Sequence, residues 1–419
     1  MSAAQGGGAQ PGRLSGELAD RLRTAGRAGP AVDAAFRAVP RHVFLPETKP
    51  AQAYRDVAVV VQRNDDGLPV SASTQPTMMA IMLEQLGLAA GHRVLEIGTG
   101  TGYNAAVMAH IVGDQRSVVT IDIVPELIGR ARGNLAAAGY EGITVICGDG
   151  AAGVPGQAPY DRIIVTAGVW DLAPQWLAQL APGGRIVLPL SVRGIQLSVG
   201  LEAAGDHWAS RPACRCSFVR MAGALTGPEA VMAIGPQPGL RALAADGPLP
   251  DAGALHEALS GPVATAPTGL RAAGTAQLAD LDLWLTLTEP HLTRLNLLGG
   301  HAGHASQAQQ RIAGLMPFGC LAEAGGPAGL GAAAVSAAGG PPRPGPAGIV
   351  VQGYGPGGAS LAGRLARQAA AWDELGRPGA SRLELSVYPP GTPVSAIASE
   401  SVVFDRPHSR LAARWLART

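Results

Sequence analysis

The sequence predicts an α/β protein with a doubly wound, mostly parallel sheet and a second, smaller α+β domain. Two observations support this fold class. Between residues 93 and 190, short apolar segments alternate with helical ones, which is typical of a parallel sheet covered on both faces. After residue 225 this alternation stops, and the apolar segments are separated by longer Gly- and Pro-rich stretches.

The N-terminal elements precede the alternating region. Residues 1–16 are mostly Gly, Ala, Gln and Ser, which predicts a disordered tail. Amphipathic spacing in residues 17–38 predicts one or two short helices. Pro76, preceded by Thr74 and Gln75, favours the start of another helix, which the apolar residues up to Leu86 continue.

Residues 17–225 are expected to form the first domain. Its strands are expected at RVLEI, SVVTIDI, ITVIC, DRIIVTA and RIVLPL. The helices between them are expected at GYNAAVMAHIV, PELIGRARGNLAAAG and APQWLAQL. Helical crossovers of this kind connect parallel strands.

Residues 226–419 are expected to form the second domain. Its strands are expected at LDLWLTLTEP, LTRLNLLG, AGIVVQGYG and RLELSVYPP, and one helix is expected at ASLAGRLARQAAAWDELG. Residues 322–348, rich in Gly, Ala and Pro, predict a flexible insert.

Composition excludes several classes of protein. The 419 residues carry a net charge of +1 and contain four cysteines, which argues against a basic nucleic-acid binder and against a disulfide scaffold. No apolar run reaches the roughly 18–20 residues of a membrane span, and the N-terminus has no secretory signal pattern. We therefore expect a cytoplasmic, monomeric protein with free thiols and with neither nucleic acid nor membrane as a partner.

The segment VLEIGTGTGYNAA, residues 94–106, carries the strongest chemical signal. An apolar strand through Glu96 leads into a turn with Gly98, Gly100 and Gly102, and a helix follows. Glycines let the backbone turn sharply and let a ligand approach it, and the helix N-terminus offers free N–H groups. The spacing differs from the Gly-x-Gly-x-x-Gly pattern of dinucleotide-binding proteins.

Polar or glycine residues also follow the next strands. Asp122 ends the second strand, Asp149 and Gly150 follow the third, and Thr166 follows the fourth. Ligands of such sheets bind beyond the carboxyl ends of the strands. A carboxylate at the position of Asp122 can accept both ribose hydroxyls of a nucleoside, so a nucleoside-containing cofactor is expected at this edge.

The Glu-x-Gly-x-Gly-x-Gly pattern resembles the first motif of Rossmann-like, S-adenosylmethionine-dependent methyltransferases. Flanking segments narrow the resemblance to the protein-L-isoaspartate O-methyltransferase family, from about residue 20 to residue 225. These segments are RHVFLP, AYRDVAV, SASTQPTMMAIMLEQL, RVLEIGTGTGYNAAVMAHIVG, ICGDGAAGVPGQAPYDRIIVTAG and LAPGGRIVLPL. Members methylate an isoaspartyl carboxylate of a protein or peptide with S-adenosyl-L-methionine, and the ester collapses to a succinimide.

The resemblance implies roles for individual residues. The cofactor contacts fall on Glu96, Gly98, Gly100, Gly102, Asp122, Asp149 and Gly150. The catalytic hydroxyl falls on Thr74, where many members have Ser, with Ser73 and Ser71 beside it. Substrate contacts are expected at Gln75, Val165 and Thr166. A simple helix N-cap is the alternative role for Thr74.

No metal is expected. His291, His301 and His304 lack an acidic or Cys partner nearby and are surrounded by glycine.

Methyl transfer to a substrate carboxylate needs no strong base, because a carboxyl group with a pKa of roughly 4 is already ionised at neutral pH.

The substrate remains open between two peptide classes. The family activity points to isoaspartyl residues. The extra domain, with its closing segment SVVFDRPHSRLAARW, is similar to that of relatives that modify an aspartate side chain in a ribosomally made precursor peptide (lanthipeptide, lasso peptide or graspetide), giving aspartimide or isoaspartate. The same motifs are also compatible with a pseudoenzyme that binds without turnover and with a small-molecule methyltransferase.

Overall fold

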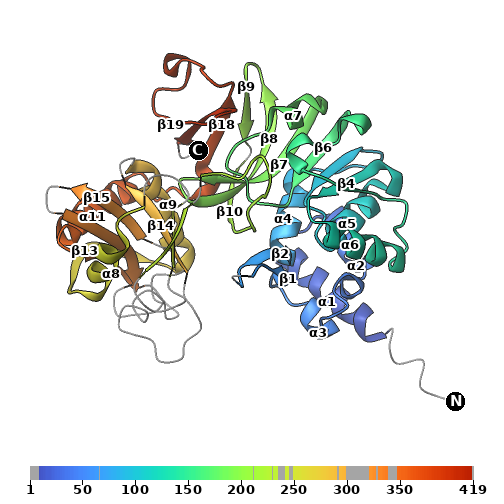
Figure 1. Cartoon of the computed structure of the whole chain (residues 1–419), viewed down its shortest axis with the longest axis horizontal. Coiled ribbons are helices and arrows are strands. Elements are labelled where there is room, and N and C mark those ends of the chain that lie inside the picture. Colours follow the sequence, from blue (N-terminus) through green and yellow to red (C-terminus); the bar gives the residue numbers. More distant parts are fainter. Residues whose placement is uncertain are drawn as a thin grey trace.

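The computed structural model describes residues 9–65, 67–210, 212–228, 230–234, 241–244, 249–289, 292–298, 320–326, 329–337 and 347–417. In these residues the strands form a hairpin, an 11-stranded sheet and a seven-stranded sheet. The seven-stranded sheet and its helices lie to one side of the larger sheet (Figure 1).

The large sheet contains all five strands expected in the first domain. They are β3 (Val94–Ile97), β4 (Val118–Asp122), β5 (Thr144–Cys147), β6 (Tyr160–Val165) and β7 (Leu180–Val192), and they run parallel in the order β7-β6-β3-β4-β5. The antiparallel strands β8 (Ile195–Ala204), β9 (His207–Ser210) and β10 (Cys214–Cys216) follow. Every residue of β3 is buried, as expected for a central parallel strand.

Helices cover both faces of this sheet. On one face lie α1 (Ala9–Thr24), α2 (Pro30–Ala38), α4 (Pro76–Leu86), α5 (Tyr103–Val112) and α6 (Pro125–Ala137). On the other face, the short helix α7 (Pro174–Ala178) buries Trp176 completely. The turn η1 (Arg41–Phe44), the helix α3 (Pro50–Ala53) and the hairpin of β1 (Val59–Arg63) and β2 (Pro69–Ser73) connect α2 to α4.

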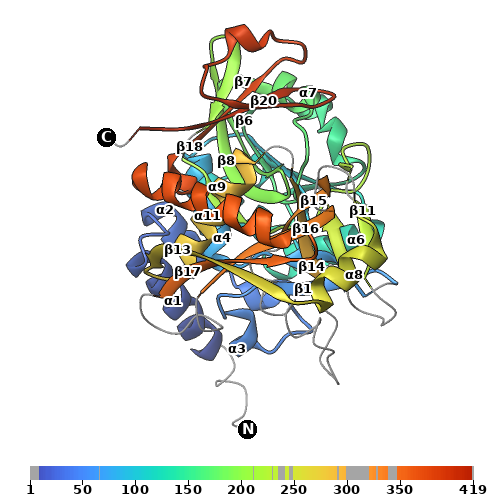
Figure 2. The same ribbon diagram turned by 90° about the vertical axis from the view of Figure 1, so that its left-hand side faces the viewer.

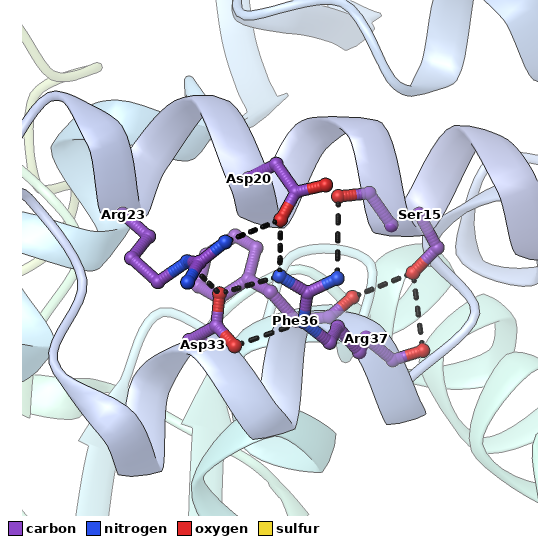
Figure 3. A network of polar contacts seen from close by, with 7 residues as sticks. Ser15, Asp20, Arg23, Asp33, Phe36 and Arg37 are labelled. Carbon is purple, nitrogen blue, oxygen red and sulfur yellow. Dashed lines mark hydrogen bonds and ion pairs between the residues drawn. The ribbon is translucent and has the colours of Figure 1, made fainter.

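Residues 9–16 are helical, so the expected tail of residues 1–16 is wrong for this part. The hydroxyl of Ser15 donates to the Phe36 carbonyl (2.7 Å), and Arg37 pairs with Asp20 and Asp33 (Figure 3). These contacts clamp α1 against α2, and packing of this kind stabilises a helix whose local sequence does not favour one.

The end of the chain returns to the large sheet. β18 (Leu383–Tyr388) pairs with β9, and β20 (Arg410–Trp415) and β19 (Val402–Asp405) continue the sheet beyond it. The expected division into domains 17–225 and 226–419 is therefore wrong for these last strands. Their apolar side chains, including those of Leu385 and Leu411, pack in the same core as β6 and β7.

The seven-stranded sheet has the order β11-β12-β14-β15-β16-β17-β13. Its strands are β11 (Ala230–Ala233), β12 (Arg241–Ala244), β13 (Val263–Ala272), β14 (Thr293–Leu298), β15 (Cys320–Gly326), β16 (Gly329–Ala337) and β17 (Ala347–Tyr354). The helices are α8 (Ala252–Ser260), α9 (Thr275–Thr288) and α11 (Gly358–Glu374). Figure 2 shows α11 lying across this sheet, where it packs on β13, β16 and β17.

The expected flexible insert at 322–348 is also wrong for its described part, which forms most of β15 and β16 and the start of β17. Small residues are needed here because the backbones approach closely. A Cβ on Gly331 would lie 3.0 Å from Gly357, and one on Gly353 in β17 would collide with the Gly358 carbonyl oxygen. At these two positions glycine therefore allows the start of α11 to pack closely against the sheet.

The segment LDLWLTLTEP, expected as a strand, forms most of α9. Leu283 and Leu287, four residues apart, pack in the core of the large sheet, whereas Leu281 and Leu285 pack in the core of the second sheet. A helix between two cores needs apolar residues on opposite sides. In this sequence that requirement produces an alternating pattern that imitates a strand.

Ion pairs also join the two sheets at α9. Asp282 of α9 lies 3.2 Å from the Arg215 guanidinium of β10 and 2.6 Å from that of Arg294 in β14. The two sheets are therefore joined by a shared helix and by a buried carboxylate with two cationic partners. None of the helices in the described ranges is long and apolar enough to cross a membrane.

Candidate active site

The glycine turn after β3 (residues 98–102) has an unusual backbone. Gly98, Gly100 and Gly102 have positive φ angles of 104°, 51° and 85°, which side-chain-bearing residues rarely adopt. A Cβ on Gly98 would lie 2.5 Å from Thr166 Oγ1. Because α5 starts directly after Gly102, the turn presents bare backbone and a helix N-terminus at one place.

Asp122, at the end of β4, holds this turn. Its Oδ2 accepts a hydrogen bond from Gly100 N–H (3.0 Å), and its Oδ1 accepts one from Val124 N–H (3.2 Å). The side chain is partly exposed, and a carboxylate can accept about four hydrogen bonds. Asp122 therefore has capacity for two further hydroxyl donors, and Ile123 beside it is 39% exposed and apolar.

Glu96 does not face this edge. It has no exposed surface, and its oxygens accept hydrogen bonds from Asn104 Nδ2 (2.8 Å) and Thr120 Oγ1 (2.7 Å). Burial raises the pKa of this carboxyl to about 7. The expected direct contact with a cofactor is thus not available to Glu96, which is linked to the glycine turn through Thr120, whose hydroxyl lies 2.8 Å from that of Thr99.

Asp149 and Gly150 follow β5, at the same edge. Asp149 Oδ1 accepts a hydrogen bond from Ala151 N–H, and its Oδ2 accepts one from Ala224 N–H, both at 2.9 Å. A Cβ on Gly150 would lie 2.5 Å from Ile97. Only glycine fits there, between the end of β5 and the end of β3.

Residues 218–226, which we call the covering segment, run along this edge of the sheet. Gly168 N–H donates to the Val219 carbonyl (2.8 Å), and Met221 N–H donates to the Gly168 carbonyl (2.9 Å). Met221 also reaches toward Gly150. The covering segment therefore bounds the site over the ends of β5 and β6.

The hydroxyl loop, residues 71–75, comprises the end of β2 and the two residues before α4, and it approaches the glycine turn. Ser71 Oγ lies 3.9 Å from the place of a Cβ on Gly100. Ser73 is 4% exposed, and its hydroxyl has no hydrogen-bond partner within the described ranges. Thr74 is partly exposed at the end of the loop. Of these three hydroxyl groups, that of Ser71 thus lies near the glycine turn at the carboxyl end of β3.

Thr74 is not the N-cap of α4, so that alternative is wrong. Gln75 occupies the N-cap without a side-chain cap. Asp56 takes over this function, because its carboxylate accepts from Thr77 N–H (2.8 Å), Thr77 Oγ1 (2.7 Å) and Gln75 Nε2 (3.2 Å). The amide of Gln75 is therefore engaged by the protein itself.

Val165 and Thr166, at the end of β6, do not offer the substrate contacts that were expected of them. Val165 is fully buried. Thr166 N–H donates to the Ile97 carbonyl (2.8 Å), and Thr166 Oγ1 donates to the Gly98 carbonyl (2.7 Å). The backbone and hydroxyl of Thr166 are thus used to hold the glycine turn, and neither is free to bind a substrate carboxylate.

Comparison with known proteins decides the family. Residues 14–225 match the family model of protein-L-isoaspartate (D-aspartate) O-methyltransferase. The chain belongs to this family. Its enzyme class is accordingly that of the methyltransferases, and the expected Rossmann-like sheet is confirmed.

Individual relatives agree with the family match. Protein-L-isoaspartate O-methyltransferase 2 of Archaeoglobus fulgidus is 46% identical over 173 residues, which cover 41% of this chain and 76% of the relative. The enzyme of Methanopyrus kandleri is 40% identical over 215 residues, covering 50% and 92% of the two chains. A solved structure of a protein-L-isoaspartate O-methyltransferase is 24% identical and covers 89% of this chain and 96% of its own, with a TM-score of 0.48.

Sequence analysis missed two parts of the candidate site. Asp56 lies in the segment AYRDVAV, whose resemblance to the family was visible, but nothing in the pattern showed that it caps α4. The covering segment was not recognised as part of the site, because its role depends on a fold-back onto the ends of β5 and β6. His291, His301 and His304 lie outside the described residues, and the described part contains no cluster of three metal-binding side chains.

Proposed function

We propose that this chain is an S-adenosyl-L-methionine-dependent carboxyl O-methyltransferase that acts on L-isoaspartyl residues of proteins or peptides, with the ester collapsing to a succinimide. The observation that carries the proposal is the approach of the hydroxyl loop to the glycine turn, where Ser71 Oγ lies 3.9 Å from the place of a Cβ on Gly100. This approach supports a single site that combines the glycine turn with the hydroxyl loop.

The residues at the edge fit the cofactor. Gly98, Gly100 and Gly102 leave the backbone bare, Asp122 has acceptor capacity for ribose hydroxyls, and Ile123 offers an apolar surface to a purine. Asp149 would meet the base, and Met221 lies close by, next to Gly150. When bound, S-adenosyl-L-methionine supplies an electrophilic methyl group on a sulfonium cation.

The hydroxyl loop would orient the substrate. Thr74 is partly exposed, so its hydroxyl could donate a hydrogen bond to a substrate carboxylate and hold it in one orientation. The Ser73 hydroxyl is buried without a partner in the described ranges, so it would need a side-chain rotation to reach the same carboxylate. Alignment of this kind is the main contribution that a reaction between an ionised carboxylate and a cationic donor requires.

Methyl transfer to two matched linear peptides tests the proposal, one with isoaspartate and one with aspartate at the same position. We expect turnover on the isoaspartyl peptide alone. Thr74→Ser should retain activity, whereas Thr74→Val, which loses a hydrogen bond to a charged group, should lower kcat about 10- to 100-fold, with unchanged affinity for S-adenosylhomocysteine. Full activity of Thr74→Val would favour a small-molecule methyltransferase.

A second candidate substrate is an aspartate side chain in a dedicated precursor peptide. It is favoured by a contact between the C-terminal part of the chain and the loop that follows β6. The Arg406 guanidinium lies 4.0 Å from the centre of the Trp170 ring and donates to the Trp170 carbonyl (2.9 Å), close to the covering segment. Cofactor binding without turnover on either linear peptide, followed by turnover on a ring-constrained aspartyl peptide, would support this candidate.

A further inference from the structure

Arg41 is a fully buried arginine that no carboxylate pairs with in the described part of the chain. Its Nε donates to the Ala53 carbonyl (2.9 Å), and its Nη2 donates to the Thr74 carbonyl (2.9 Å). Its Nη1 is buried without a partner in the described ranges. A buried cation without a counter-charge is costly, so this placement requires an explanation.

The guanidinium joins the hydroxyl loop to the glycine turn. Its central carbon lies 4.9 Å from the centre of the Tyr103 ring. Tyr103 is the first residue of α5, directly after Gly102. The Tyr103 ring in turn contacts Phe36 and Phe44, with ring centres 6.2 and 5.4 Å apart. Arg41 is thus fixed by an aromatic cluster at the point where the two halves of the site meet.

The Thr74 carbonyl depends on this arginine. β2 ends at Ser73 and α4 begins at Pro76, so Thr74 lies outside both elements. Pro76 has no N–H to donate, and the backbone hydrogen bonds of α4 begin with Met79 N–H donating to the Gln75 carbonyl. Arg41 therefore supplies a hydrogen bond to the loop backbone that neither the strand nor the helix provides.

We infer that Arg41 is the positioning residue of the hydroxyl loop, holding Ser73 and Thr74 in register with the glycine turn. This inference rests on the proposed function. Arg41 acts through the loop backbone and has no surface with which to touch a substrate. Its positive charge lies close behind the loop and interacts with the Asp56 carboxylate without forming an ion pair among the described contacts; it also favours an anionic carboxyl group there.

Arg41 is expected to act through its hydrogen bond to the loop backbone and through its positive charge. Two variants of the full chain separate these effects. Arg41→Lys keeps the charge but loses the planar fork that reaches Ala53 and Thr74 together. It should lower kcat about 10- to 100-fold with KM nearly unchanged. Arg41→Met loses the charge as well, and it should also raise KM for the isoaspartyl peptide. Affinity for S-adenosylhomocysteine should stay within about threefold of the wild type in both variants.

Arg21→Met is a matched control. Arg21 donates to the Tyr54 carbonyl (3.0 Å), one residue after Ala53, and is exposed. This variant should keep kcat and KM at wild-type values. If Arg41→Lys had wild-type kcat, or if it lost cofactor affinity as strongly as kcat, the inference would be overturned. If Arg41→Met does not fold, Arg41→Lys alone decides.

Amide hydrogen exchange provides a readout that is independent of turnover. Exchange in residues 71–75 should be faster in Arg41→Lys than in the wild type, whereas exchange in β4 should be unchanged. If the wild type methylates no peptide but this difference is present, the proposed function fails and the positioning role stands. Unchanged exchange in the loop would overturn the positioning role whatever the activity.

Discussion

The hydroxyl of Ser409 donates a 2.5 Å hydrogen bond to Oδ1 of Asp171, although the two residues are 238 positions apart in the chain. Asp171 is buried in the loop that follows β6, and its Oδ2 also accepts from His408 N–H (2.7 Å). The turn between β19 and β20 is thus anchored beside the candidate active site. The C-terminal strands are part of the same folded unit as the methyltransferase sheet.

Asp171→Ala should destabilise the protein by about 2–4 kcal/mol, because it leaves buried donors of the β19–β20 turn without an acceptor. Urea unfolding measures the change. Asp405→Ala is the control, since Asp405 lies in the same hairpin but is exposed and pairs only with Arg410 among the contacts described; it should change stability by less than about 1 kcal/mol. Equal effects of the two substitutions would contradict the anchoring role.

Asp122→Asn should weaken S-adenosylhomocysteine binding about 10- to 100-fold. Hydrogen bonds to a charged group contribute about 1.5–3 kcal/mol, and Asp122 is proposed to accept ribose hydroxyls while it holds Gly100. Isothermal titration calorimetry provides the measurement. Asp114→Asn removes a carboxylate that caps a turn before β4 and should leave affinity unchanged. An unaltered affinity in Asp122→Asn would remove this residue from the cofactor site.

Gly98→Ala should cost about 2–4 kcal/mol of stability and at least tenfold in S-adenosylhomocysteine affinity. Its φ of 104° is strained for alanine, and the new methyl would displace Thr166 from its hydrogen bond to Gly98. Gly113→Ala is the matched control, with φ of 79° and open space around it. It should cost about 1–2 kcal/mol and leave affinity intact, as denaturation and calorimetry would show.

Glu96 gives the folded state a pH dependence. Its pKa is about 7 in the folded protein against 4.5 for a free glutamate, so the folded state holds a proton that the unfolded state loses first. This contribution is complete below about pH 4.5 and is lost as the pH rises through about 7. Glu96→Gln should flatten the decline in unfolding free energy between these values. Urea titrations at several pH values would show it, and an unchanged slope would mean that Glu96 is ionised when folded.

The sequence predicted those parts of the fold that depend on local pattern. Strands β3 to β7 and helices α5 and α6 lie where the alternation of apolar segments placed them, because each is buried by neighbours close in the chain. The glycine turn and the position of Asp122 at the end of β4 were predicted for the same reason. The spacing of these residues along one strand-turn-helix unit and the next strand is sufficient to predict where they lie.

The errors arose where burial is decided by distant segments. The leucines of α9 alternate because they serve two cores, and one sequence pattern cannot distinguish this from a strand. Glu96 occupies a family motif position, yet its direction into the protein follows from Asn104 and Thr120. Thr166 was expected to face the substrate, but it closes the glycine turn. Such choices depend on tertiary contacts that spacing does not reveal.

The order of strands has a consequence for the growing chain on the ribosome. β9 ends at Ser210, and its partner β18 begins only at Leu383. At about 5–20 residues per second, the nascent chain carries an unpaired β9 edge for roughly ten seconds or longer. An open edge of this kind attracts other strands. Chaperone binding to chains truncated between these points should therefore exceed binding to the completed protein.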